Sequence, residues 1–208
     1  VNLLKELTDE EEVVAYLHGQ LTLLRETQIR DGLHILGAVP SGKDLANLVV
    51  SILRFDIGEH PSIRRCILEC RGFDYEEIIE NPAAVNNEFG KTNGEVLDES
   101  TKMAVKIFEQ LLAGVDAESL PTARDRELLS ICKEVLGCDF KKGSEDLVKT
   151  VSFGVSLIPK IARGVNDEIT NLIRGFNSEY IESGASGALT RGKIDVLPTG
   201  RNFYAIDP

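Results

Sequence analysis

Apolar residues recur every three or four positions through most of the chain, the spacing that places them on one face of an α-helix. Thr8 and Glu11 form a capping box that opens a helix near Asp9, and Gly32 ends it. The same pattern predicts further helices over residues 45–53, 61–70, 95–112 and 121–136, with a short capped turn over 74–79. The chain is therefore expected to be mainly helical.

The last helical block begins at Ser144, which is followed by two acidic residues. Pro159 interrupts its apolar stripe, and a proline inside a helix removes a backbone donor and clashes with the preceding turn. We therefore expect Pro159 to kink or end this helix. A separate final helix is predicted to start at Asp167 and to end at Gly175.

Alternating β patterns are few, so the predicted fold class is a mainly α, multi-helix domain with a C-terminal Gly/Pro-rich loop region. At most a small extended or β element is expected, around residues 194–197 and 202–206. The predicted organisation is a helical domain over 1–175, with a subdivision near the polar stretch 86–94 left open. Residues 176–208 form a Gly-rich, ligand-facing loop segment packed on that domain. The start at Val1 suggests a fragment of a larger subunit.

Composition and charge exclude several classes of protein. A formal net charge of −11 opposes nucleic-acid binding, which requires a basic face. No apolar run is long enough to span a membrane and no signal peptide opens the chain. Four cysteines in a chain of 208 residues favour a reduced compartment, so a cytoplasmic location is expected. Cys66 and Cys70 share a helix spacing, and we interpret them as buried small hydrophobes rather than metal ligands.

Residues 37–43 have the spacing of a phosphate-binding loop, with glycines at both ends and Lys43 last. The next residue is Asp44, where such a loop needs Ser or Thr to hold Mg²⁺. A short apolar run precedes the motif and no series of parallel strands follows it. We interpret Ser41 and Asp44 as the start of a helix, with no nucleotide site.

The chemistry of the C-terminal stretch differs from everything before it. Residues 184–207 contain four glycines and Pro198, and the charges of residues 184–206 are Arg191, Lys193 and Arg201 against Asp195 alone. Glycines let backbone N–H groups approach a ligand, and arginines bind carboxylates or phosphates through two parallel hydrogen bonds. A plain surface loop remains an alternative on composition alone.

Two motifs resemble one protein family. The C-terminal segment TRGKIDVLPTGRNFY, and the earlier IRDGLHILG of residues 29–37, are similar to motifs of the tetrapyrrole-binding large subunit of cobaltochelatase and the related H subunit of magnesium chelatase. The sequence departs from the family pattern at positions where prolines are expected, so the loop is expected to be less rigid. These departures are Glu182, Ala185, Leu189 and Ile194.

The resemblance implies part of a large subunit of an ATP-dependent chelatase, a ligase that forms nitrogen–metal bonds, in cobalamin or chlorophyll-type cofactor biosynthesis. The divalent metal substrate is Co²⁺ or Mg²⁺, with cobalt favoured. ATP and its Mg²⁺ are expected on partner subunits, namely an AAA+ ATPase and a partner bearing a metal site. The isolated fragment is expected to be inactive.

His34 is the candidate general base for removing the inner N–H protons, although a packed histidine satisfied by backbone remains an alternative. The candidate tetrapyrrole-binding residues are Thr190, Arg191, Gly192, Thr199, Gly200, Arg201 and Asn202. The metal-delivering carboxylate is not singled out, and Glu182 and Asp195 are weak candidates.

A competing hypothesis is a helical protein-interaction module without substrate contact, which would present the basic loop to an acidic protein surface. Tetrapyrrole titration separates the two hypotheses. An independent small enzyme is disfavoured because no Ser/His/Asp or Cys/His signature is present.

Overall fold

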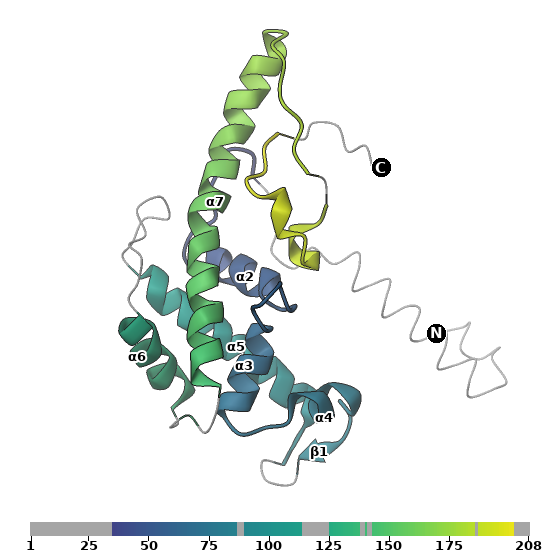
Figure 1. Ribbon diagram of the computed structural model, residues 1–208, viewed down its shortest axis with the longest axis vertical. Helices are drawn as coiled ribbons and strands as arrows, with labels where there is room; N and C mark the ends of the chain where they lie inside the picture. Colours follow the sequence, from purple (N-terminus) through teal and green to yellow (C-terminus); the bar gives the residue numbers. More distant parts are fainter. Residues whose placement is uncertain are drawn as a thin grey trace, which may run out of the picture. The chain divides into compact units, whose positions relative to one another are not determined.

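The computed structural model describes residues 35–86, 90–113, 125–137, 140, 143–185 and 187–201, all within one compact unit, 35–208. These residues are mainly helical, which confirms the predicted fold class (Figure 1). The elements are α2 (Gly42–Ile52), α3 (Ile63–Cys70), α4 (Tyr75–Glu80), β1 (Val85–Asn86), β2 (Lys91–Thr92), α5 (Asn93–Leu112), α6 (Asp125–Leu136), α7 (Ser144–Phe176) and the 3₁₀ turns η2 (Leu189–Arg191) and η3 (Ile194–Val196). None of the helices in the described ranges is long and apolar enough to cross a membrane.

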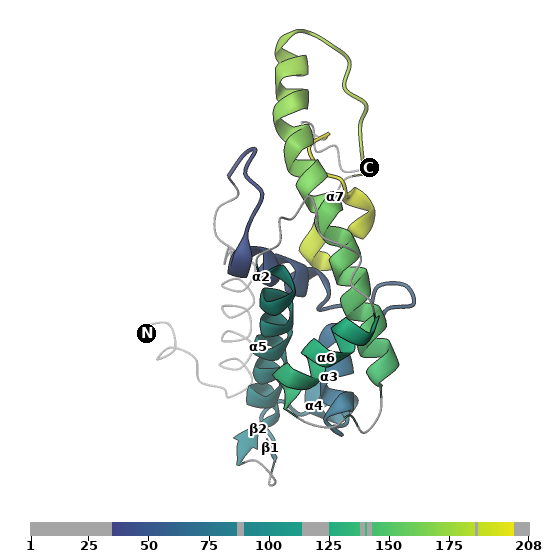
Figure 2. The same ribbon diagram turned by 90° about the vertical axis from the view of Figure 1, so that its left-hand side faces the viewer.

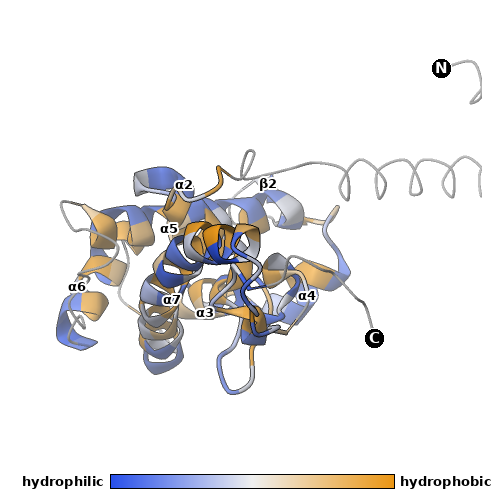
Figure 3. Cartoon of the chain, turned by 90° about the horizontal axis from the view of Figure 1, so that it is seen from above, coloured by the Kyte–Doolittle hydropathy of each residue, from blue (hydrophilic) through white to orange (hydrophobic). Residues whose placement is uncertain are grey.

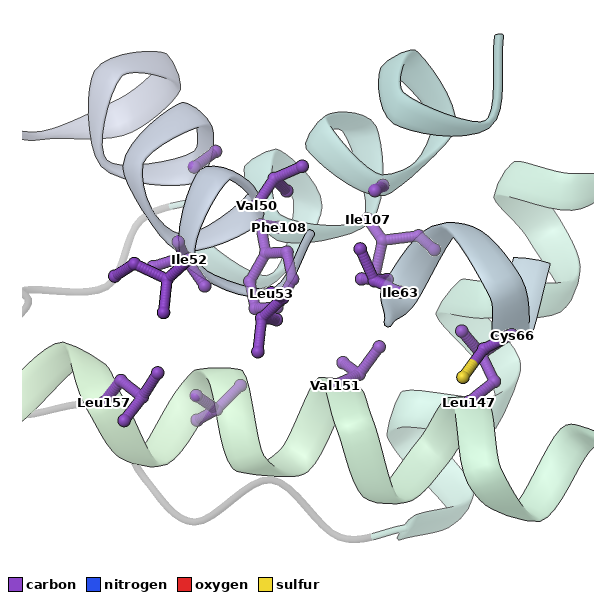
Figure 4. Close-up of a cluster of buried hydrophobic side chains, with 14 of the residues drawn as sticks. Val50, Ile52, Leu53, Ile63, Cys66, Ile107, Phe108, Leu147, Val151 and Leu157 are labelled. Carbon is purple, nitrogen blue, oxygen red and sulfur yellow. The ribbon is translucent and has the colours of Figure 1, made fainter. Parts of the chain in front are cut away.

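The main core lies between α2, α3, α5, α6 and α7, each of which contributes its apolar face (Figures 3 and 4). Phe108 of α5 is fully buried near its centre. Gly154 of α7 makes room for this ring, since a Cβ there would lie 2.6 Å from Phe108 Cζ and 2.7 Å from Leu53 Cδ1. Interiors are packed as densely as organic crystals, so even one methyl group at this position would disturb the core.

The predicted helix over 95–112 is confirmed, and it begins two residues earlier than expected, at Asn93. Thr92 and Glu95 form a complete capping box, with Thr92 Oγ1 accepting from Glu95 N and Glu95 accepting from Thr92 N. The Thr92 N–H and the Thr92 hydroxyl both donate to the Glu95 carboxylate, and these two hydrogen bonds lower its pKa. The residues before the cap pair as an antiparallel hairpin, β1 with β2.

The position predicted for a β element was wrong in its first part. Residues 194–196 form η3, closed by a hydrogen bond of 3.0 Å from Leu197 N to Ile194 O. No strand pairs with this segment among the described residues, so a local bond satisfies the backbone instead. The second part, 202–206, lies outside the described residues.

Pro159 was predicted to kink or end the helix. It does not end it, and the separate helix predicted from Asp167 does not exist. α7 runs without a break for 33 residues (Figure 2). Pro159 is exposed, whereas Ile158 and Ile161 beside it are buried. The ring therefore lies on the solvent side, where water can solvate the carbonyl that loses its partner. Packing of the opposite face keeps the helix continuous through Pro159.

The cysteines of the described residues behave as the sequence indicated. Cys66, Cys70 and Cys132 are buried in the core. Burial raises the pKa of Cys66 to about 11 and that of Cys132 to about 12. These thiols therefore stay protonated and unreactive near neutral pH, as expected of small core residues.

Candidate functional site

The C-terminal segment of residues 187–201 lies beside α7 (Figures 1 and 2). After α7 the chain turns at Asn177–Ser178 and runs back along the helix. Val196 is buried, and Leu189, Ile194 and Leu197 pack against the main core. The segment is therefore anchored by apolar side chains, although it has no regular structure beyond two 3₁₀ turns.

The TGR part of the segment contacts the backbone of α7 directly. A Cβ on Gly164 of α7 would lie 2.5 Å from Thr199 Oγ1 and 2.7 Å from Thr199 N. Gly200 has a φ of +81°, and a Cβ there would lie 2.5 Å from Gly164 O and 2.6 Å from Glu168 N. Two glycines, one on the helix and one on the loop, allow this close approach because neither carries a side chain.

The end of the earlier motif, residues 29–37, reaches the same turn of α7. Gly37 N donates a hydrogen bond of 3.1 Å to Glu168 Oε2. With a φ of +71°, Gly37 also packs so tightly that a Cβ would lie 2.5 Å from Ile169 Cγ1. Gly37 and Gly200, which are far apart in sequence, therefore both contact Glu168. The two motifs that the sequence separates meet on one turn of α7.

The cationic side chains of this region have no acidic partner within the described part of the chain. Neither Arg191 nor Arg201 forms a salt bridge or side-chain hydrogen bond there, whereas Arg163 of α7 pairs with Asp167 at 3.9 Å. Arg191 and Lys193 are exposed, and Arg201 is half-buried beside α7. Arg201 follows Gly200 directly, so a positive charge lies next to the contact of Gly200 with Glu168 in an acidic protein, and it suits an anionic ligand.

The structure places six of the eight predicted catalytic and binding residues. Thr190 and Arg191 lie in η2, and Gly192 follows them in the left-handed conformation with a φ of +87°. Thr199, Gly200 and Arg201 lie on α7 as described above. His34 and Asn202 lie outside the described residues.

The two carboxylates predicted as weak metal candidates, Glu182 and Asp195, are both exposed. Among the described residues, no three His, Cys, Asp or Glu side chains gather closely enough to hold a metal ion. The choice between Glu182 and Asp195 therefore stays open.

The comparisons with known proteins decide the family. The family described as CobN/Magnesium Chelatase matches residues 2–208. The chain belongs to this family.

Relatives in this family are much longer than the chain. The aerobic cobaltochelatase subunit CobN of a Sinorhizobium species is 32% identical over 209 residues, which cover 95% of this chain and 16% of that protein. The subunit of the same name from Pseudomonas aeruginosa is 25% identical over 215 residues, 96% of this chain and 16% of that protein. The solved catalytic subunit of cobaltochelatase from Mycobacterium tuberculosis matches with a TM-score of 0.56 and 27% identity, covering 93% of this chain and 14% of that one.

The phosphate-loop lookalike begins a helix, as predicted. Ser41 is the N-cap residue of α2, although its side chain makes no capping hydrogen bond. The N–H of Gly37, which a phosphate loop would direct at its ligand, donates instead to the Glu168 carboxylate. A carboxylate at this position would repel phosphate, so the motif lacks the geometry of a nucleotide site.

A separate cleft of about 640 Å³ lies between α6 and the first half of α7. It contains His60, whose ring stacks on Phe153 with centroids 4.2 Å apart, and the side chain of Lys149. A rise of 1.5 Å per residue puts Gly164 about 22 Å along the helix axis from Lys149. None of the residues lining this cleft belongs to either family motif, so the cleft and the candidate site do not coincide. His60 lies outside the helices, and sequence reasoning did not single it out.

Sequence reasoning also missed the α7 residues on which the site is built, namely Gly164, Glu168 and Asn171. A glycine inside an amphipathic helix costs about 1 kcal/mol against alanine, so Gly164 was a signal of close approach by another segment. Asn171 is buried on the face that α7 turns toward the loop. A polar residue on a buried helix face indicates a specific partner.

Proposed function

We propose that this chain forms part of the tetrapyrrole-binding region of a large chelatase subunit, which holds the macrocycle while a divalent metal is inserted. One observation carries the proposal: the described parts of the two family motifs both contact Glu168, next to Arg201, whose side chain has no acidic partner in the described chain. The match to two cobaltochelatase subunits favours cobalt over magnesium as the metal substrate.

In this proposal the arginines and the loop backbone bind the periphery of the macrocycle. Arg191 and Arg201 bind its carboxylates or amides through charge-assisted hydrogen bonds, and Thr190, Thr199 and Asn202 add polar contacts beside Gly192 and Gly200. His34, three residues before Gly37 in the sequence, accepts inner N–H protons because imidazole titrates near neutral pH. Glu182 or Asp195 passes the metal to the ring as a hard oxygen ligand.

The proposal extends to the partners. ATP hydrolysis belongs to an AAA+ subunit and its metal-site-bearing partner, in the cytoplasm and within cobalamin-type cofactor synthesis. The hydrogen bond from Gly37 N–H to Glu168 supports this division of labour. Because of it, residues 37–43, which have the spacing of a phosphate-binding loop, do not direct this N–H at a ligand.

Titration of the full-length native protein with a metal-free corrin precursor and with protoporphyrin tests the proposal. Binding should shift the absorbance bands of the macrocycle and saturate at one equivalent. Preference for the corrin supports cobalt, and preference for protoporphyrin supports magnesium. Lack of saturable binding to either macrocycle would refute the proposed function.

Lys43→Ala should leave ATP-dependent chelation by the assembled complex nearly unchanged. Lys43 lies in the first turn of α2, and residues 37–43 do not have the geometry of a phosphate-binding loop. The measurement is ATP turnover with all subunits present, and a phosphate-loop lysine of the AAA+ partner is the matched control. A loss with Lys43→Ala as large as the loss in that control would show that residues 37–43 are a nucleotide site.

A protein-interaction module remains the second candidate function, and one observation favours it. The last turns of α7 expose Ile169, Ile173 and Phe176, with Phe176 82% exposed. Apolar residues exposed at helical spacing are typical of a surface that another protein or domain covers. Under this hypothesis the basic loop contacts an acidic partner, and neither macrocycle binds in the titration.

A further inference from the structure

Asn171 of α7 is a buried polar residue whose two amide atoms are both engaged. Only 7% of its surface is exposed. Its Nδ2 donates a hydrogen bond of 2.8 Å to Gly200 O, in the middle of the TGR segment. Its Oδ1 accepts a hydrogen bond of 3.2 Å from Arg174 Nη1. A buried amide with both ends satisfied fixes the groups around it, because losing either bond leaves a polar atom unpaired.

Arg174 continues the network to the segment that follows α7. Its Nε donates to Glu179 Oε2 at 3.0 Å, and its Nη2 donates to Tyr180 O at 2.7 Å. The guanidinium thus holds the returning chain, while Asn171 holds both the guanidinium and the loop. A planar fork with several fixed donors suits this task better than a lysine ammonium.

The position of this network is specific. Gly200 O accepts from Asn171, and the residue that follows Gly200 is Arg201, for which we proposed a role in binding the macrocycle. The carbonyl of Gly200 belongs to the peptide unit that leads into Arg201, so anchoring that carbonyl fixes where the arginine side chain begins. Thr199 and Gly200 also contact Gly164 and Glu168, which lie on the same face of α7, about two turns and one turn before Asn171.

We propose that Asn171 is a positioning residue for tetrapyrrole binding. It fixes the Thr199–Arg201 segment so that Arg201 is directed at the macrocycle before the ligand arrives, and Arg174 keeps the Asn171 amide in the orientation that donates to Gly200. This inference rests on the proposed function. Positioning of this kind strengthens binding because the loop does not have to be ordered when the ligand binds.

Asn171→Leu tests the inference, since leucine keeps the approximate size and removes both hydrogen bonds. Tetrapyrrole affinity of the full-length protein should fall about tenfold, the effect of losing one well-placed charge-assisted contact. In an Arg201→Ala background the same substitution should change affinity less than twofold, because the residue it positions is gone. Equal losses in both backgrounds would overturn the positioning role.

The chain offers a matched control in Asn93. Its side chain is 5% exposed, and its Nδ2 donates to the carbonyl of a loop residue, Asn81, at 2.9 Å. Asn93→Leu removes the same kind of bond at the start of α5 and should leave affinity unchanged. If Asn93→Leu weakens binding as much as Asn171→Leu, the effect is loss of general stability and the inference is wrong.

A second measurement does not depend on any ligand. Hydrogen–deuterium exchange of the backbone over residues 194–201 should become faster in Asn171→Leu and stay unchanged in Asn93→Leu. Faster exchange in a protein that binds no tetrapyrrole would refute the proposed function and leave Asn171 as a loop anchor only. Unchanged exchange in Asn171→Leu would refute the inference, whatever the wild type binds.

Discussion

His34→Ala should lower the rate of metal insertion at saturating tetrapyrrole by about 10²–10⁴-fold, the usual contribution of a general base. Tetrapyrrole affinity should stay close to that of the wild type. The physical reason is that the inner N–H protons must leave as the metal enters, and an imidazole removes them without contributing to the peripheral contacts. The measurement is single-turnover metal insertion by the assembled complex, together with an absorbance titration of the same variant.

Arg201→Ala should affect tetrapyrrole affinity, whereas His34→Ala should affect the rate of metal insertion. Removing a charge-assisted contact of roughly 1.5–3 kcal/mol should lower tetrapyrrole affinity tenfold or more, while the rate at saturation changes little. Both variants must melt like the wild type before their effects are compared. The assignment of His34 is wrong if its removal weakens binding and leaves turnover at saturation untouched. The same insertion assay on His60→Ala shows whether the histidine of the separate cleft acts as the base instead.

Gly164→Ala should detach the TGR segment from α7 and lower tetrapyrrole affinity by at least about tenfold, since the contact of Arg201 is lost with it. The new Cβ would lie 2.7 Å from the backbone nitrogen of Thr199, an atom that no rotamer change can move. The helix itself gains from the substitution, because alanine is favoured over glycine in a helix interior by about 1 kcal/mol. Helical content should therefore stay at the wild-type level while binding is lost.

Gly175→Ala makes the same chemical change on the same helix and serves as the control. A Cβ there would lie 3.5 Å from Ile181 Cδ1, an ordinary van der Waals contact. Circular dichroism reports the helix and an absorbance titration reports the site in both variants. If Gly164→Ala binds the macrocycle as tightly as Gly175→Ala does, the segment of residues 199–201 contributes nothing to binding.

Local chemistry was enough to predict most of the helices among the described residues. The apolar spacing over 95–112 and the turn capped by Asp74 reappear as α5 and α4, because capping bonds involve residues only three or four positions apart. Interactions between residues so close in the chain can be predicted from a short stretch of sequence. The candidate residues of the C-terminal motif could likewise be chosen without knowledge of the fold. The choice depended only on the types and order of Thr190, Arg191, Thr199 and Arg201 in the sequence.

The tertiary structure decided what long-range packing controls. Pro159 does not end α7, because the buried face of the helix, including Ile158 and Ile161, outweighs one missing hydrogen bond. Residues 194–196 form a 3₁₀ turn because no described strand lies beside them to pair with. In both cases the sequence had a local preference, for a helix end at Pro159 and for a strand at 194–196. Contacts with residues distant in the sequence, or the lack of them among the described residues, decided which structure formed.

The meeting of the two motifs is the clearest example. Residues 29–37 and 190–202 were each recognisable in the sequence, yet nothing in either predicts that Gly37 and Gly200 contact the same glutamate. That arrangement depends on Gly164, Glu168 and Asn171, three α7 residues that each contact atoms of the loops. The sequence by itself determined which residues are candidates for the chemistry. Only the packing of loops on α7 brought the described parts of the two motifs to one turn of that helix, because the hydrogen bond from Gly37 to Glu168 joins residues 131 positions apart.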